Sequence, residues 1–219
     1  MHKPEIKTKL ILIEGLPGSG KTTTCKFLGA HFLEQNVDCR WYLETDDVHP
    51  IDCDSIKLKE LSNKLPPLWR SFVEQVLDED FLAVIESRLW QNTALFMFMS
   101  EYPVEEIVEL HQTVWKELAD LAPSLIYLHQ PDVEKAMKRL LQERDRKLVE
   151  KDIHFTSKYP WFQNRGLSDL DGWIAFFNEW QAVAEILYND FPYRKKRIKN
   201  AHEDWVGAYK QMINFVKLA

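Results

Sequence analysis

Short apolar runs alternate along the chain with longer segments in which apolar residues recur every three or four positions. The short runs predict five strands, at 9–14, 39–44, 81–85, 124–129 and 195–199. The longer segments predict helices at 21–36, 55–77, 93–99, 103–121, 131–149, from 168 onward, and at 203–218. Strands that alternate with helices indicate an α/β fold with a parallel sheet, here as a single domain over residues 1–219.

Local signals mark several helix boundaries. Pro66 and Pro67 lack a backbone N–H, so we expect them to interrupt the helix at 55–77. Pro103 suits the first turn of the helix that it opens. Ser168, with Asp171 three residues later, resembles a capping box and predicts the start of the next helix.

Residues 15–22 read Gly-Leu-Pro-Gly-Ser-Gly-Lys-Thr, which fits the phosphate-binding pattern Gly-x-x-x-x-Gly-Lys-[Ser/Thr] at every fixed position. The segment also lies between an apolar strand and an amphipathic helix, as this motif requires. Its glycines let successive backbone N–H groups face a phosphate, and the positive end of the helix adds to the attraction. We therefore predict that this loop binds ATP with Mg²⁺.

The side chains of this loop have predicted roles. The Lys21 ammonium reaches the β- and γ-phosphates, and the Thr22 hydroxyl ligates the metal ion. The alternative, a glycine-rich turn that only happens to contain Lys and Thr, does not account for a match at every position. The predicted nucleotide-binding residues are Gly15, Pro17, Gly18, Ser19, Gly20, Lys21, Thr22 and Thr23.

Composition narrows the classes of partner. Lys and Arg number 28 against 34 Asp and Glu, a formal net charge of -6, so nothing draws the whole chain to nucleic acid or to an anionic membrane. The apolar run at 10–13 is too short for a signal-peptide core, and no run approaches the roughly 20 residues of a membrane span. The three cysteines show neither a disulfide framework nor metal spacing. We expect a cytoplasmic protein without nucleic-acid or membrane partners.

Two segments resemble the thymidylate kinase and deoxynucleoside kinase superfamily, and in particular a bacterial thymidylate-kinase-like group. They are residues 14–24 and the run Leu-Ile-Tyr-Leu-His-Gln-Pro-Asp at 125–132, in which a strand steps through Pro-Asp into a helix. The resemblance spans about residues 10–148. It implies a P-loop NTPase fold with a five-stranded parallel sheet of order 2-3-1-4-5 and a helical lid at about 139–166. Related kinases often dimerise, so it also leaves a homodimer open.

The resemblance places lid arginines on the helix after that step, which carries Arg139, Arg144 and Arg146. Arg139 and Arg146 are seven residues apart and share a helix face, whereas Arg144 lies off that face unless the helix ends first. Arg144 and Arg146 are the predicted catalytic pair, because phosphoryl transfer needs positive charge near the transferred group. The alternative is a solvated basic face balanced by neighbouring acids.

Acidic residues follow the predicted second strand at Glu44, Asp46 and Asp47. A glutamate at the position of Glu44 resembles the general base of the deoxynucleoside kinases, which takes a proton from the acceptor hydroxyl. Asp46 and Asp47 compete for that role, act on the magnesium side, or form a turn. We predict Glu44 as the catalytic base and Asp46 as a substrate ligand.

The third strand leads into Glu86-Ser87-Arg88. Related kinases have an acid followed directly by arginine here, the acid holding Mg²⁺ through water and the arginine gripping the acceptor. The inserted Ser87 departs from that pattern and puts the direction of Arg88 in doubt. We predict Glu86 as the metal-side acid with Thr22, and Arg88 as a substrate ligand.

Further residues are expected around the same cleft, because the carboxyl ends of parallel strands meet at one edge of the sheet. Gln91 would read polar edges of the acceptor, and His49, Trp69 and Trp90 would border it unless they are core residues. The loop at 200–203 would border the adenine. A later aromatic cluster falls at helical spacing and is interpreted as core: Trp161, Phe162, Trp173, Phe176, Phe177 and Trp180.

These features predict an ATP-dependent small-molecule kinase whose acceptor is a nucleoside, a nucleotide or another small hydroxyl- or phosphate-bearing compound. The sequence contains no Asn-Lys-x-Asp guanine-reading motif and no ABC-type signature. Two alternatives remain open, a nucleotide-binding regulatory protein with little turnover and an NTPase without an acceptor.

Overall fold

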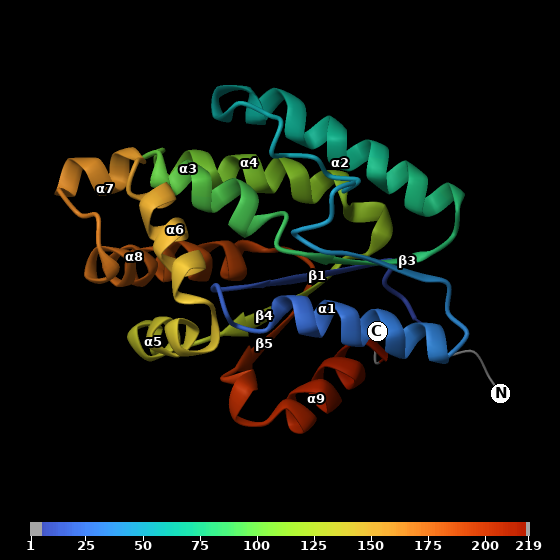
Figure 1. Cartoon of the computed structure of the whole chain (residues 1–219). Coiled ribbons are helices and arrows are strands. Elements are labelled where there is room, and N and C mark those ends of the chain that lie inside the picture. Colours follow the sequence, from blue (N-terminus) through green and yellow to red (C-terminus); the bar gives the residue numbers. More distant parts are fainter. Residues whose placement is uncertain (1–5, 218–219) are drawn as a thin grey trace.

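Five parallel strands form the centre of the molecule, and the computed structural model describes residues 6–217 around them. The sheet has the order β2-β3-β1-β4-β5 (Figure 1). Its strands are β1 (Leu10–Gly15), β2 (Cys39–Tyr42), β3 (Leu82–Glu86), β4 (Ser124–His129) and β5 (Arg194–Lys199). The fold class and the strand order predicted from the sequence are confirmed.

Helices cover both faces of this sheet (Figure 1). One face packs against α1 (Lys21–Glu34) and α9 (Trp205–Lys217). The other packs against α2 (Leu61–Asp78), α4 (Val104–Glu117), α5 (Val133–Glu143) and α8 (Leu170–Asp190). Three shorter helices complete this second layer: α3 (Leu95–Met99), α6 (Arg146–Thr156) and α7 (Pro160–Arg165).

The alternation of side chains along β1 explains why the strand is apolar from Leu10 to Ile13. Leu10 and Leu12 belong to the core under α2, α4 and α8. Ile11 and Ile13 belong to the core under α1 and α9. A strand that is buried on both faces needs apolar residues at every position, which is typical of parallel sheets.

The register of the strands brings their carboxyl ends to one edge. Ile13 of β1 lies opposite Glu86, the last residue of β3. Gly15 lies opposite Leu128 of β4, and Tyr42 at the end of β2 lies opposite Ile85. The phosphate-binding loop, the acids after β2 and the end of β3 therefore meet at the same edge.

Helix α2 is continuous through both of its prolines. The prediction that Pro66 and Pro67 interrupt it was wrong, and the helix begins at Leu61, after a 3₁₀ turn at Leu58–Glu60, rather than at 55. Each proline removes one intrahelical hydrogen bond. Pro66 is buried, and helices in proteins are stabilised mainly by the packing of such an apolar face. Here that packing keeps the helix intact.

The predicted single helix at 131–149 is two helices, which is a second correction. Helix α5 ends at Glu143, and Arg144 is extended, with φ −102° and ψ 155°. Asp145 then caps α6, because its carboxylate accepts a hydrogen bond of 2.8 Å from the backbone N–H of Lys147. Arg139 and Arg146 consequently lie on different helices and share no face.

Three smaller boundaries also differ from expectation. The cap of α8 is Asp169, which accepts from the N–H of Gly172 at 2.9 Å, one residue after the predicted Ser168. The helix that leaves β3 was predicted at 93–99, but it starts earlier, with a π-helical turn at Trp90–Ala94 before α3. The predicted end of the last helix at residue 218 lies outside the described residues, as do residues 1–5. Within residues 6–217, no helix has the length and apolarity that crossing a membrane requires.

Candidate active site

The phosphate-binding loop turns sharply between β1 and α1. Gly20 caps α1 in a left-handed conformation with φ 93°, and a Cβ atom there would lie 2.2 Å from the ring of Trp205. Gly18 also has a positive φ, of 72°, and its Cβ would approach Leu140 to 2.8 Å. Side chains are therefore excluded at both positions, and the backbone stays open to a phosphate.

Lys21, the first residue of α1, is buried inside this loop. Its ammonium donates hydrogen bonds to the carbonyl oxygens of Gly15 (3.0 Å) and Leu16 (3.1 Å). Burial lowers the pKa of Lys21, and the carboxylates of Glu44, Glu86 and Glu14 counter that shift.

Thr22 and Glu86 meet at the base of the site. The Thr22 hydroxyl donates a hydrogen bond of 2.5 Å to the Glu86 carboxylate, and the backbone N–H of Glu44 donates to the other carboxylate oxygen at 3.4 Å. A hydroxyl and a carboxylate are oxygen ligands of the kind that Mg²⁺ prefers. Within residues 6–217 no group of three His, Cys, Asp or Glu could hold a metal by itself. The pair suits Mg²⁺, which usually takes one or two carboxylates and completes its shell with phosphates and water.

Glu44 is held at the end of β2 by Gln91. The Gln91 amide donates to both carboxylate oxygens of Glu44, at 2.9 and 3.1 Å. Burial raises the pKa of Glu44, whereas Lys21 lowers it. Asp46 lies in a turn instead, where its carboxylate accepts from the N–H of Leu43 at 2.7 Å.

The Arg88 side chain is buried behind Glu44, with 2% of its surface exposed. Ser87 is left-handed, with φ 62°, and the chain after it carries the guanidinium toward the loop that follows β2. One terminal nitrogen donates to Asp54 at 2.8 Å, and the other donates to the carbonyl of Glu44 at 3.1 Å. Arg88 is thus near the site, but it does not line the cavity.

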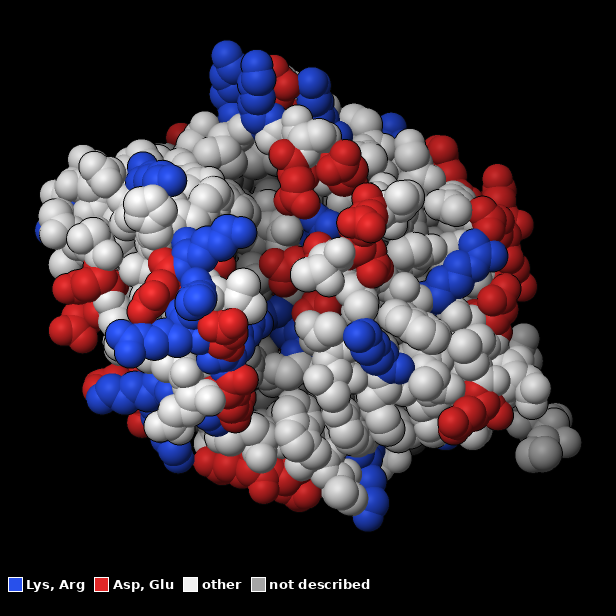
Figure 2. Space-filling model, viewed as in Figure 1, with Lys and Arg blue, Asp and Glu red and all other residues white. Residues whose placement is uncertain are grey.

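A cavity of about 480 Å³ joins the phosphate-binding loop to the acids. Figure 2 shows a hollow on this face between α6 and the start of α1, with acidic side chains gathered along one rim. Its lining residues come from the loop, the ends of β2 and β3, the π-helical turn and α3, the α5–α6 junction, α6 and α8. They are Pro17, Gly18, Gly20, Lys21, Thr22, Thr23, Glu44, Thr45, Glu86, Gln91, Leu95, Phe96, Met99, Glu143, Arg144, Asp152, Phe155, Thr156, Trp173 and Phe177.

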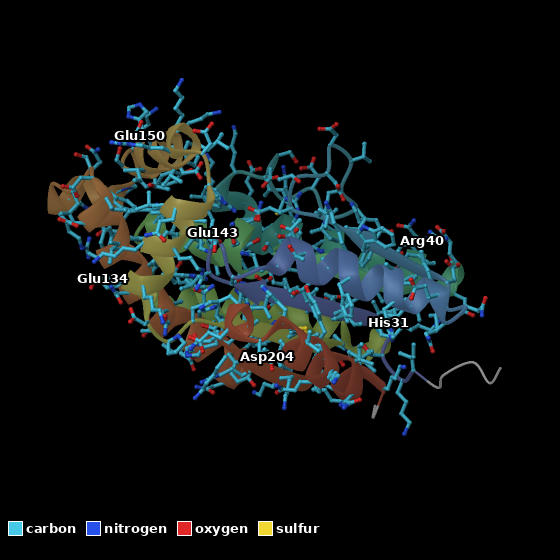
Figure 3. All side chains as sticks on the ribbon, turned by 60° about the horizontal axis from the view of Figure 1, so that its bottom comes forward. His31, Arg40, Glu134, Glu143, Glu150 and Asp204 are labelled. Atoms are coloured by element: carbon cyan, nitrogen blue, oxygen red, sulfur yellow. The ribbon has the colours of Figure 1, made fainter. Side chains whose placement is uncertain are left out.

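The two predicted catalytic arginines, Arg144 and Arg146, lie apart. Arg144 lines the cavity, whereas the Arg146 side chain is 86% exposed and forms an ion pair of 2.8 Å with Glu150. Figure 3 shows Glu143 at the end of α5 and Glu150 on α6, on either side of the break between the helices. The break at Arg144 therefore separates one arginine from the other.

Glu14 is a buried acid for which no role was predicted. One of its carboxylate oxygens accepts from the backbone N–H groups of Leu89 and Trp90, both at 3.1 Å. The other oxygen has no hydrogen-bond partner among residues 6–217. Burial raises the pKa of Glu14 to about 8. Glu14 thereby fixes the start of the π-helical turn that carries Gln91.

Several lining residues escaped the sequence reasoning. Asp152 and Phe155 reach the cavity from α6, which the break at Arg144 separates from α5, and Phe96 reaches it from α3. Trp173 and Phe177 were interpreted as core, and they are buried core residues that also line the cavity. Their helical spacing predicted that they belong to the core, but it did not indicate that they also line the cavity.

The remaining candidates border the site less directly. The ring nitrogen Nδ1 of buried His49 accepts from the N–H of Ile51 at 2.9 Å, and Trp69 and Trp90 are core residues. None of these three lines the 480 Å³ cavity. His202, in the loop after β5, lines a separate hollow of about 730 Å³ beside α5.

Comparison with known proteins places the fold. No protein-family model matches the chain, and no curated protein matches it in sequence. Its structure is similar to the crystal structure of thymidylate kinase from Ehrlichia chaffeensis, with a TM-score of 0.52 and 12% sequence identity. The similarity covers 94% of this chain and 97% of that chain. At this identity the similarity shows a P-loop kinase-like fold and nothing finer.

Proposed function

We propose that the chain is an ATP-dependent phosphotransferase, which moves the γ-phosphate of ATP to a small acceptor. One observation carries the proposal: the Thr22–Glu86 pair and the Glu44 carboxylate share one 480 Å³ cavity with the phosphate-binding loop. Transfer needs a phosphate end and an acceptor end in one enclosed place, since catalysis of this reaction is mostly positioning and charge stabilisation.

At the phosphate end, the backbone N–H groups of residues 15–22 and the Lys21 ammonium hold the triphosphate. Thr22 and Glu86 would hold Mg²⁺, which would supply positive charge to neutralise the phosphates. Arg144, which lines the same cavity, stabilises the charge on the transferred group. We propose residues 139–166 as the lid that brings it there.

At the acceptor end, Glu44 is the general base. The acceptor oxygen attacks the γ-phosphorus, its proton passes to Glu44, and the bond from phosphorus to the ADP oxygen breaks. Gln91 orients the carboxylate through its two hydrogen bonds. Burial makes Glu44 a stronger base than an exposed glutamate, because it raises the pKa.

The test is transfer of label from γ-labelled ATP to a panel of nucleosides, nucleoside monophosphates, sugars and aminoglycoside-like compounds, with magnesium. Lys21→Ala removes the phosphate ligand, and Lys26→Ala, on the exposed side of the same helix, is the matched control. We expect a labelled product that the Lys26 variant keeps and the Lys21 variant loses by about 100-fold or more.

Other outcomes would replace this proposal. Undiminished transfer by Lys21→Ala contradicts the mechanism. Label released only as phosphate would identify an NTPase, and label retained on bound ATP would identify a nucleotide-binding regulatory protein.

A further inference from the structure

We propose that the acceptor is a hydroxyl compound with a flat ring and no phosphate group, an inference that rests on the proposed function. Four features in and around the cavity support it, one of which is its aromatic lining. The others are the balance of charge along the cavity wall, the sequestration of Arg88, and the unpartnered polar atoms of Trp173 and Gln91.

The charged residues that line the cavity disfavour an acceptor phosphate. Four are carboxylates, Glu44, Glu86, Glu143 and Asp152. Among the described residues only Lys21 and Arg144 are lining cations, and the proposed function assigns both to the transferred phosphate. A phosphomonoester carries about −1.5 to −2 charge at pH 7 and would need a cation of its own. It would instead lie beside carboxylates, where like charges repel.

Arg88 is the nearby cation that could have served an acceptor phosphate, and its terminal nitrogens are already engaged. They donate to Asp54, to the carbonyl of Glu44 and, at 3.7 Å, to the sulfur of Cys53. The remaining nitrogen, Nε, has no partner within residues 6–217, but it is buried and the side chain is absent from the cavity wall. The Arg88 side chain is buried, whereas that of its partner Asp54 is 57% exposed, so the ion pair holds a buried guanidinium to a carboxylate that reaches solvent.

Part of the cavity wall is aromatic. Phe96 and Phe155 meet edge to face with ring centroids 6.3 Å apart, and Trp173 and Phe177 do so at 5.0 Å. All four line the cavity. Aromatic faces bind flat unsaturated rings through offset or edge-to-face contacts. A sugar-like acceptor without such a ring would leave this wall unused.

Two residues that line the cavity each have a buried polar atom without a hydrogen-bond partner among residues 6–217. Trp173 is 3% exposed, and its indole N–H has no hydrogen-bond acceptor among residues 6–217. The amide oxygen of Gln91 has no donor within the same range. An indole N–H can only donate and an amide oxygen can only accept. The pair therefore suits an uncharged ring that offers one acceptor atom and one donor group.

The Asp152 carboxylate strengthens the exclusion of phosphate from the α6 side. It lines the cavity, and it makes no hydrogen bond or ion pair with any other described residue. Burial raises the pKa of this carboxylate and outweighs Arg144 and Lys151, which act on it through space and lower its pKa.

The experiment compares eight common nucleosides and deoxynucleosides with their 5′-monophosphates. Transfer from γ-labelled ATP is measured for each, and binding of each is measured by tryptophan fluorescence with a non-hydrolysable ATP analogue present. We expect transfer to, or binding of, at least one nucleoside, with its monophosphate weaker by about tenfold or more.

Trp173→Phe tests whether the indole N–H donates a hydrogen bond to the acceptor, because the variant keeps an aromatic ring and removes the N–H. We expect the acceptor KM to rise about three- to tenfold, with kcat and the KM for ATP within about twofold. Trp115→Phe is the matched control, since Trp115 is also buried with an unpartnered N–H but lies outside the cavity. If both variants raise the acceptor KM equally, the cause is a general loss of core packing, and the proposed role of Trp173 is overturned.

The outcomes separate this inference from the proposed function. Transfer to monophosphates in preference to nucleosides would keep the kinase and overturn the inference. Nucleoside binding that excludes monophosphates, without any transfer, would support the described acceptor pocket and overturn the kinase. Failure of every nucleoside both to bind and to accept phosphate overturns the inference.

Discussion

The Thr22 hydroxyl and the Glu86 carboxylate are joined by a hydrogen bond of 2.5 Å across 64 positions of the chain. The parallel pairing of β1 with β3 makes this contact, because it sets Ile13 opposite Glu86 just before the phosphate-binding loop begins. The contact links the one strong sequence motif to an acid that no motif identifies, and it is the natural place to test metal binding.

Glu86→Gln should weaken the use of magnesium. The amide keeps an oxygen that can accept from Thr22, but it removes the negative charge that favours a divalent cation. We expect the magnesium concentration for half-maximal transfer to rise about 10- to 100-fold. A magnesium titration of the transfer rate measures it, with Glu79→Gln, at the surface beside Arg40, as the control. An unchanged midpoint would remove Glu86 from the metal site.

The two lid arginines should behave differently. Arg144→Ala removes a cation from the cavity wall, so we expect kcat to fall about 100- to 1,000-fold. Arg146→Ala removes an exposed ion pair with Glu150, and we expect kcat to change by less than about twofold. Both variants are measured under saturating ATP. Equal losses would show that α6 rearranges to bring Arg146 into the site.

Ionisation of Glu44 should determine how kcat falls at low pH. The ionised carboxylate is the active form, and burial raises its pKa above the ordinary value of 4.5. The wild-type kcat should therefore fall as the pH drops through that raised pKa. Glu44→Gln should lower kcat about 100- to 10,000-fold and abolish this limb. Persistence of the limb in the variant would assign it to another group.

Glu14 should make stability depend on pH. Its folded-state pKa of about 8 exceeds the unfolded value of 4.5, so the folded chain binds an extra proton between these values. The stabilisation is complete below pH 4.5 and is lost as the pH rises through about 8. Relative to wild type, Glu14→Gln should gain about 1.4 kcal/mol of unfolding free energy per pH unit between pH 5 and 7.5. Urea unfolding at several pH values measures the difference in unfolding free energy between the variant and the wild type. A difference that does not change with pH would contradict the prediction.

The sequence predicted β1, β3 and β4 well because these strands are buried on both faces and are therefore largely apolar. The edge strand β5 reads Arg-Lys-Lys-Arg-Ile-Lys, of which only Ile198 is buried, so it lacks that signal. The phosphate-binding loop could also be predicted from the sequence, because phosphate binding dictates both its residue types and their spacing. The shared edge of Glu44 and Glu86 followed from the strand order, since strand ends of a parallel sheet converge, whereas the resemblance to related kinases supplied their roles. Their roles as base and metal-side acid remain predictions.

The part of the cavity proposed to bind the acceptor was harder to predict from the sequence. It depends on the break at Arg144, where the cap formed by Asp145 competes with continuation of the helix, and helical spacing alone cannot decide between them. It also depends on Ser87, whose left-handed backbone turns Arg88 behind Glu44. Such single-residue turns change the direction of every side chain after them, and no periodic pattern reports them.

The weak anchoring of α6 has a consequence for how the site opens. Within this fully described helix Val149 alone is buried, while Leu148 and Phe155 are 55% and 48% exposed. Little apolar surface is lost if the helix detaches, so its opening free energy lies far below that of the whole domain. Backbone amides of α6 should exchange hydrogen with solvent long before those of β1. Substrates that bridge α6 and the phosphate-binding loop would slow that exchange, because they would stabilise α6 against local opening.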